Sequence, residues 1–97
     1  MKAGDLICYN AGGMKHKTLG LVIELCAKLP HYQVESRLHV LVQWCVVGSI
    51  MPRRAWGFRD LKTHKNISSR DYSRSISTSE LVWHEFGNWF EVTNEKS

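Results

Sequence analysis

Arginine side chains alternate with aromatic rings in one short stretch of this 97-residue chain, from Met51 to Lys62. A guanidinium group binds a phosphate through two parallel hydrogen bonds, and an exposed aromatic ring stacks on a nucleobase. Each stacked base contributes about 1–3 kcal/mol, which suffices for weak binding of a single strand. The stretch therefore predicts a nucleic-acid contact. Its members are Arg53, Arg54, Trp56, Phe58, Arg59 and Lys62, with Lys65 just beyond them.

A competing interpretation places the two rings of this stretch in the protein core. A chain of this length needs most of its aromatic side chains inside, because it has few large residues with which to fill a core. If Trp56 and Phe58 are buried, the neighbouring arginines simply face water. Both interpretations remain open, since each is compatible with the same residue types at the same spacing.

The positive charge of the chain is concentrated around the same stretch. Residues 53–74 contain seven basic and two acidic residues, a net charge of +5, whereas the rest contains six basic and seven acidic residues, a net charge of −1. A localised basic segment is typical of proteins that bind polyanions, although many such segments are only solvated loops. We therefore expect RNA or another single-stranded nucleic acid as the partner.

Residue types suited to catalysis or metal binding do not form recognisable motifs. The sequence contains no GxSxG, P-loop or HExxH pattern, and its five histidines and three cysteines lack the CxxC or HxxxH spacing of a zinc site. Cys8, Cys26 and Cys45 each lie in an apolar segment, where cysteine behaves as a small hydrophobic residue. We expect a binding module with no enzymatic activity, no cofactor and no metal.

The number of cysteines, the first residues and the length of the apolar runs together predict the cellular setting. An odd number of cysteines without a secretory signal indicates reduced thiols in the cytoplasm. The first residues include Asp5 where a signal peptide would need an apolar stretch. The longest apolar runs are far shorter than the roughly 20 residues of a membrane span, so we expect no membrane partner.

Apolar residues recur with a period of two in the first half of the chain, which predicts β-strands. Residues 38–46 show this alternation most clearly, with Val40, Val42 and Trp44 on one face and Leu41 on the opposite, nominally outward face. Residues 19–26 alternate in the same way, with Val22 on the outward side. Shorter runs at 6–9, 50–51 and 89–93 predict further strands, and Pro52 places the fourth near a sheet edge or bulge.

The segment from residue 57 to residue 79 is rich in serine and poor in large apolar residues, and we interpret it as a long excursion. Potential capping residues at 77–80 then precede the apolar run Leu81–Phe86, which predicts one or two helical turns over 79–86. The alternative is a strand through Leu81–Trp83, because valine and tryptophan favour sheets.

Together these elements predict an all-β fold, a small closed barrel of about five strands with a short helical turn before the last strand. We expect a single domain over residues 1–93, with an insertion at 57–79 and a polar tail at 94–97.

Four short hydrophobic segments resemble those of a known group of small barrels. They are residues 4–7 (GDLI), 19–24 (LGLVIE), 40–44 (VLVQW) and 89–93 (WFEVT). Their pattern is similar to SH3-like barrels of KOW or Tudor type, which are common as short proteins of marine tailed phages. Barrels of related shape include the Sm-like RNA-binding proteins, but the Sm signature of glycine, aspartate and asparagine in fixed order is absent here. A phage origin would place the protein in the cytoplasm of an infected cell.

In barrels of this type the first and third loops flank one groove, so the resemblance implies that Lys15 and Lys17 extend the basic surface. Tyr9 alternates with Cys8 and is expected to line such a groove, or else to be a partly buried surface tyrosine. A second hypothesis is a protein-interaction or assembly module that forms homo-oligomers or docks a protein partner. It rests on an open sheet edge near Pro52 and on the outward apolar residues Val22 and Leu41.

Overall fold

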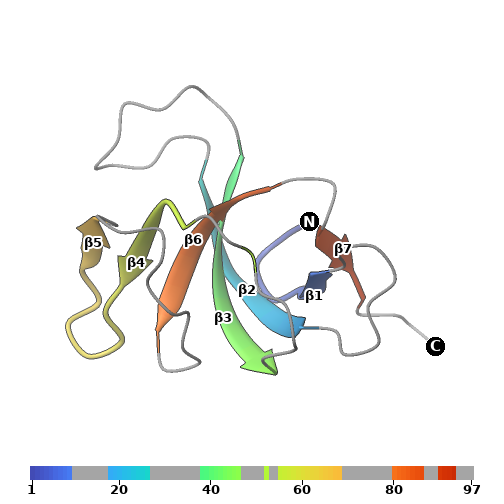
Figure 1. The fold of residues 1–97 in the computed structure, drawn as a ribbon, viewed down its shortest axis with the longest axis horizontal. Helices are drawn as coiled ribbons and strands as arrows, with labels where there is room; N and C mark the ends of the chain where they lie inside the picture. The colour runs from blue at the N-terminus through green and yellow to red at the C-terminus, as the bar shows by residue number, and fades with distance from the viewer. Residues whose placement is uncertain are drawn as a thin grey trace.

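The computed structural model describes residues 1–9, 18–26, 38–46, 52, 55–68, 80–86 and 90–93. These residues form an all-β structure in which seven strands make one antiparallel sheet (Figure 1). The strands are β1 (Leu6–Tyr9), β2 (Thr18–Cys26), β3 (His39–Val46), β4 (Gly57–Arg59), β5 (Asn66–Ser68), β6 (Leu81–Glu85) and β7 (Phe90–Val92). Their order across the sheet is β5-β4-β6-β3-β2-β1-β7.

The sheet curls strongly around its main core. Strands β6 and β7 are four spacings apart in the strand order, which corresponds to about 19 Å in a flat sheet. The rings of His84 in β6 and Phe90 in β7 nevertheless lie with their centroids 5.8 Å apart. Trp44 of β3 stacks on Phe90 at 6.2 Å. The sheet must therefore bend until β6 and β7 face each other across the core.

The curled sheet does not close into a barrel. Among the described strands, β5 and β7 lie at the two ends of the order, so each has a neighbour on one side only. The predicted all-β class is confirmed, whereas the predicted closed barrel is wrong for this part of the chain. The pairing of strand edges explains the difference, because one edge of β6 pairs with β3 and the other with β4, so β6 has no edge left to pair with β7.

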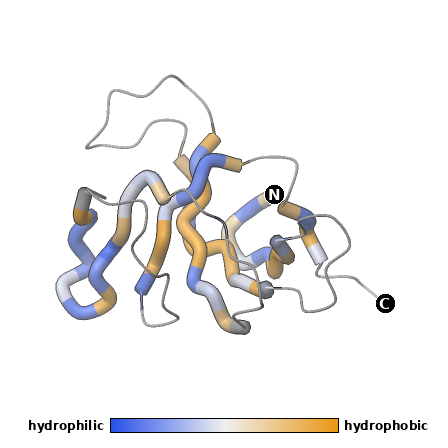
Figure 2. The backbone as a smooth tube through the Cα atoms, viewed as in Figure 1, coloured by the Kyte–Doolittle hydropathy of each residue, from blue (hydrophilic) through white to orange (hydrophobic). Residues whose placement is uncertain are grey.

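The main core lies on the face that the sheet curls around. Its buried members are Ile7, Val22, Val40, Val42, Trp44, Ala55, Phe58, Val82 and Phe90. Inside it, the indole N–H of Trp44 donates a 3.2 Å hydrogen bond to Nε2 of His84, so the polar atoms of two buried rings satisfy each other. The hydrophobic residues gather in the central strands, whereas the loop between β4 and β5 is mainly hydrophilic (Figure 2).

A β-bulge in β2 changes which face its side chains occupy. Val22 is opposite Val42 in the register, but Glu24 is opposite Leu41, so Ile23 is an extra residue in β2. The extra residue reverses the alternation beyond it. Val22 therefore packs in the main core, while Glu24 lies on the second face of the sheet with Leu41.

The second face carries its own small apolar cluster of Leu41, Leu81 and Trp83. The side chains of Ile23, Cys26, Trp56 and Leu61 pack against this cluster. Val22 is 1% exposed and Leu41 is 0% exposed, so the expectation that both lie on outward faces is wrong. The sheet is covered on both faces at its centre, which removes this support for an exposed apolar docking surface.

The second half of the chain differs from the helical prediction. Residues 81–85 form strand β6, which pairs with β3 and β4, so the alternative of a strand in this region is confirmed and the helical turn there is wrong. The expected excursion at 57–79 contains the two short strands β4 and β5. The predicted strand at 50–51 and the polar tail at 94–97 lie outside the described residues.

Candidate functional site

The loop that joins β4 to β5 is built around the side chain of Asp60. Its Oδ1 atom accepts hydrogen bonds from the backbone N–H groups of Lys62 at 2.7 Å and Thr63 at 3.1 Å. The backbone of Asp60 also donates to the carbonyl of Lys65 at 3.0 Å and accepts from the N–H of His64 at 2.8 Å. His64 adopts φ of 60°, the left-handed conformation that reverses the chain. The loop is therefore a tight, internally bonded turn.

These amide contacts also act on the charge of the carboxyl group. The N–H groups of Thr63 and Lys62 hold the pKa of Asp60 below its ordinary value of 3.8. Asp60 is therefore ionised at neutral pH, and its charge is directed at the backbone of the loop rather than at a basic side chain.

The basic side chains of this loop face solvent. We call residues 60–65 the basic loop, in which Lys62, His64 and Lys65 are all exposed. Because the turn holds the backbone in place, the charges of Lys62 and Lys65 both lie at the tip of one hairpin. Two of the predicted contact residues, Lys62 and Lys65, thus lie on one ordered surface feature.

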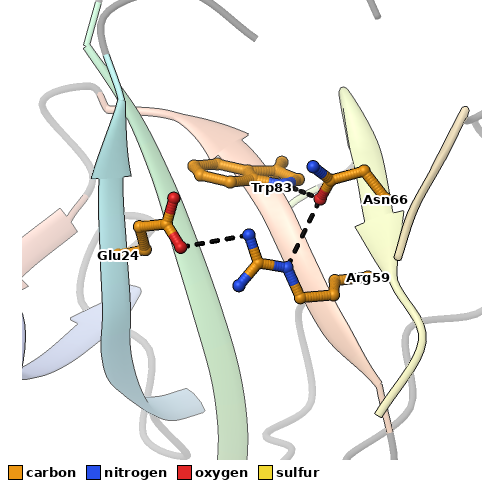
Figure 3. A network of polar contacts seen from close by, with 4 residues as sticks. All are labelled: Glu24, Arg59, Asn66 and Trp83. Carbon is orange, nitrogen blue, oxygen red and sulfur yellow. Dashed lines mark hydrogen bonds and ion pairs between the residues drawn. The ribbon is translucent and has the colours of Figure 1, made fainter. Parts of the chain in front are cut away.

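Arg59 lies at the end of β4, on the second face of the sheet, within a group of polar contacts shown in Figure 3. Its Nη2 atom is 3.0 Å from Oε1 of Glu24, and its Nε–H donates to Oδ1 of Asn66 at 3.4 Å. The same Asn66 oxygen accepts a 3.0 Å hydrogen bond from the indole N–H of Trp83. The guanidinium carbon lies 5.9 Å from the centroid of the Trp83 ring. We call these four residues the Arg59 network.

Four strands supply the Arg59 network, and strand register brings them together. Asn66 of β5 is directly opposite Arg59 of β4, so both side chains point to the same face. Trp83 of β6 lies on that face beside Leu41 of β3. Glu24 of β2 reaches it only because of the bulge at Ile23. The network therefore depends on the curl and register of the whole sheet.

The aromatic residues of the predicted site divide between core and partial exposure. Phe58 is 1% exposed in the main core, so its ring has no exposed face on which a base could stack. This position agrees with the interpretation that placed the ring in the protein core. Trp56 is partly buried beside the second cluster, where its ring meets the edge of His39 at 5.9 Å. Tyr9 packs on Phe90 at 5.7 Å, at the margin of the main core rather than in an open groove.

The structure does not describe the other four residues that were predicted to contact a nucleic acid. Arg53, Arg54, Lys15 and Lys17 lie outside the described residues. The structure therefore brings together Arg59, Lys62 and Lys65 of the predicted set, on one hairpin.

Sequence reasoning did not identify Glu24, Asn66 or Trp83 as part of this site. Asn66 and Trp83 stand in segments that we interpreted as excursion and helix. One signal was present, because Glu24 is an acidic residue inside an otherwise apolar strand. Such a residue needs a polar partner or solvent, and here it has Arg59.

A second polar group of interest is the buried side chain of His39. It is 0% exposed, and neither of its ring nitrogens has a hydrogen-bond partner among the residues that the structure describes. Cys26 and Glu85 flank it in register on the adjacent strands. Even so, no group of three or more His, Cys, Asp or Glu side chains in the described ranges is placed to hold a metal ion.

The three cysteines form no disulfide and lie in different environments. Cys8 is buried, as expected for a small hydrophobic residue, while Cys26 is partly buried and Cys45 is exposed. Cys45 is the extra residue of a second bulge, because Gly20 is opposite Trp44 and Leu19 is opposite Val46. The bulge explains why an apolar segment presents this thiol to solvent.

Comparisons with known proteins were made by family, by sequence and by structure. No family model, curated protein or solved structure matches this chain. The described residues include no helix with the length and apolar character needed to cross a membrane. The functional interpretation therefore depends on the site itself.

Proposed function

We propose that the protein is a non-enzymatic binding module that contacts the phosphates of a single-stranded nucleic acid through the basic loop and Arg59. The observation that carries this proposal is the exposure of Lys62, His64 and Lys65 on a turn that Asp60 holds in shape. Lysine is a suitable phosphate contact as a mobile point charge, and arginine adds a planar fork.

The ordered loop favours binding because less backbone freedom is lost when a ligand is captured. The partly buried ring of Trp56 stands at the start of the same hairpin, where its backbone N–H donates to the carbonyl of Trp83 at 2.9 Å. Its exposed portion is suited to stacking with one unpaired base. A single strand is the better ligand than a duplex, because its bases are open to such a ring.

We further propose that the five strands β7, β1, β2, β3 and β6 represent an open form of the SH3-like barrel that the sequence resembles. Support comes from their consecutive antiparallel pairing and from the ring contacts that join β6 to β7 across the core. The β4–β5 hairpin is then an addition to that barrel, and it carries the basic loop.

The test is a titration of labelled oligouridine and oligothymidine with the parent protein and with charge-reversal variants. We expect Lys62→Glu and Lys65→Glu each to weaken binding about tenfold at low salt, since each replaces an attractive charge with a repulsive one. Lys2→Glu is the matched control, because Lys2 is also exposed but lies at the N-terminus before β1. All three variants change the net charge equally.

The salt dependence provides the second readout. For a single strand, the logarithm of the affinity falls with the logarithm of the salt concentration with a slope of about −0.7 per neutralised phosphate. Lys62→Glu and Lys65→Glu should flatten this slope, and Lys2→Glu should not. A parent protein that binds neither oligonucleotide at low salt, or equal effects of all three variants, would refute the proposal.

A second candidate function is that of a protein-interaction or assembly module. The observation that favours it is the presence of two terminal strands, β5 and β7, which carry the exposed side chains of Ile67 and Val92, 43% and 45% exposed respectively. A strand edge with exposed apolar residues is suited to pairing with another chain. Light scattering tests the homo-oligomer form, and a monomer at high concentration would exclude it.

A further inference from the structure

Arg59 is held by its neighbours but still has hydrogen-bond donors to offer. A guanidinium group carries five N–H donors. Within the described part of the chain, Nε donates to Asn66, Nη2 contacts Glu24, and Nη1 donates to no residue. The side chain of Arg59 is 19% exposed, so it is not fully closed off from solvent. A ligand that accepts hydrogen bonds therefore has an unused amino group to bind.

Two neighbours besides Glu24 hold the position of the guanidinium group. Its central carbon lies over the ring of Trp83, at 5.9 Å from the ring centroid. Asn66 holds Nε, and the same oxygen is anchored by the indole N–H of Trp83. An arginine held in this way loses little side-chain freedom when it binds an anion, so the network prepares it for a ligand.

Glu24 is the one acidic member of the Arg59 network, and it occupies Nη2 from the solvent-exposed side. Its side chain is 47% exposed, compared with 19% for Arg59 (Figure 3). An ion pair this exposed is weak, with a typical contribution of about 0–1 kcal/mol. Displacing the Glu24 carboxylate from Arg59 therefore costs an incoming anion little free energy. As long as the carboxylate stays in place, however, its negative charge repels the anion.

We infer that Arg59 is a phosphate-binding residue whose Nη1 and Nη2 groups receive one backbone phosphate of a single strand in exchange for the carboxylate of Glu24. This inference rests on the proposed function and deepens it. It assigns one phosphate to a hydrogen-bonding site at Arg59, whereas the basic loop attracts phosphates by its charge. Glu24 then acts as a competing anion that limits affinity at this position, and Asn66 and Trp83 are positioning residues.

The first test compares Arg59→Lys with Lys2→Arg. Arg59→Lys keeps the charge but removes the planar fork of N–H donors. We expect it to lower oligouridine affinity about tenfold while leaving the salt slope unchanged, because the number of neutralised phosphates stays the same. Lys2→Arg is the matched control, a charge-conserving exchange at an exposed position outside the basic loop, and it should change affinity less than twofold.

The second test compares Glu24→Gln with Glu91→Gln. Glutamine at position 24 keeps an oxygen that accepts from Arg59 but removes the competing charge. We expect Glu24→Gln to raise affinity about threefold to fivefold. Glu91 is an exposed acidic residue on β7, at the other end of the strand order, and Glu91→Gln should show only the smaller effect of net charge.

The outcomes separate this inference from the proposed function. If the parent binds oligonucleotides but Arg59→Lys binds equally well, or Glu24→Gln gains no more than Glu91→Gln, the role of Arg59 is overturned while binding of a single strand through the basic loop stands. A purely structural role for Arg59 gives the same result, with only the melting temperature lowered.

A separate titration with inorganic phosphate tests the phosphate site at Arg59 in the event that the protein binds no oligonucleotide. It follows the Nε–Hε resonance of Arg59 by NMR in the parent and in Glu24→Gln. A shift that saturates at lower phosphate concentration in Glu24→Gln supports the phosphate site even if no oligonucleotide binds, in which event only the proposed function fails. No shift in either protein overturns the inference.

Discussion

Gly20 provides the sharpest stability prediction, because two buried side chains occupy the space where any other residue would place its Cβ atom. A Cβ atom added at Gly20 would lie 2.4 Å from Cγ1 of Val42 and 2.8 Å from Cε3 of Trp44. Carbon atoms in contact prefer about 3.5–4.0 Å. Both neighbours are 0% exposed in the main core, so neither has free space into which to move.

Two effects of Gly20→Ala oppose each other, and their magnitudes decide the outcome. The φ angle of Gly20 is not in the left-handed region, so alanine would ordinarily stabilise the fold by about 0.4–1 kcal/mol through the unfolded state. Overpacking of a rigid core costs about 1–3 kcal/mol, and two contacts this short belong at the upper end. We expect a net loss of about 2 kcal/mol in the free energy of unfolding, or a melting temperature lower by about 8–16 °C.

The assay is urea denaturation followed by tryptophan fluorescence, with circular dichroism as the second probe. Val42→Ala and the Gly20→Ala/Val42→Ala double variant complete a double-mutant cycle. Because Val42→Ala removes the closest atom, alanine at position 20 should cost at least 1 kcal/mol less in that background. If Gly20→Ala is as stable as the parent or more stable, the close packing of β2 against β3 at this point is incorrect.

Two further predictions concern polar groups outside the Arg59 network. The lowered pKa of Asp60 means that its contribution to stability is present above the ordinary value of 3.8 and is lost as the pH falls through the folded-state pKa below 3.8. NMR titration of the Lys62 and Thr63 amides should therefore show their shifts changing below pH 3.8, and a midpoint above that value would contradict the assignment. At His39, whose two buried ring nitrogens have no hydrogen-bond partner in the described ranges, His39→Leu should leave the free energy of unfolding unchanged or raise it by up to about 1 kcal/mol. A loss of more than about 2 kcal/mol in urea denaturation would show that the imidazole makes a polar contact essential to the fold.

The alternation of side chains in β3 was readable from the sequence because it depends on one strand alone. Val40, Val42 and Trp44 are buried on one face, as the period of two predicts. The same reading failed for β2, since a bulge depends on the pairing of two strands and leaves no local signal in either. Val22 precedes the bulge at Ile23, and it was placed on an outward face because one strand alone does not show that both faces of the sheet are covered.

Strand β6 shows how tertiary contacts override a local signal. Serine and threonine before Leu81 are typical of a helix start, yet residues 81–85 pair with strands on both sides. Leu81, Val82 and Trp83 are all buried, on opposite faces of a sheet that is covered on both sides. Burial of large side chains on two faces favours a strand here more than capping favours a short helix.

The sequence by itself determined the all-β class and the position of the basic segment, because strand periodicity and charge are properties of short stretches of chain. Only the tertiary structure decided that Phe58 is buried, that Lys62 and Lys65 share an ordered turn, and that Glu24 meets Arg59. Contacts of the last kind join strands far apart in sequence. They depend on register, bulges and the curl of the sheet, which arise only when all the strands pack together.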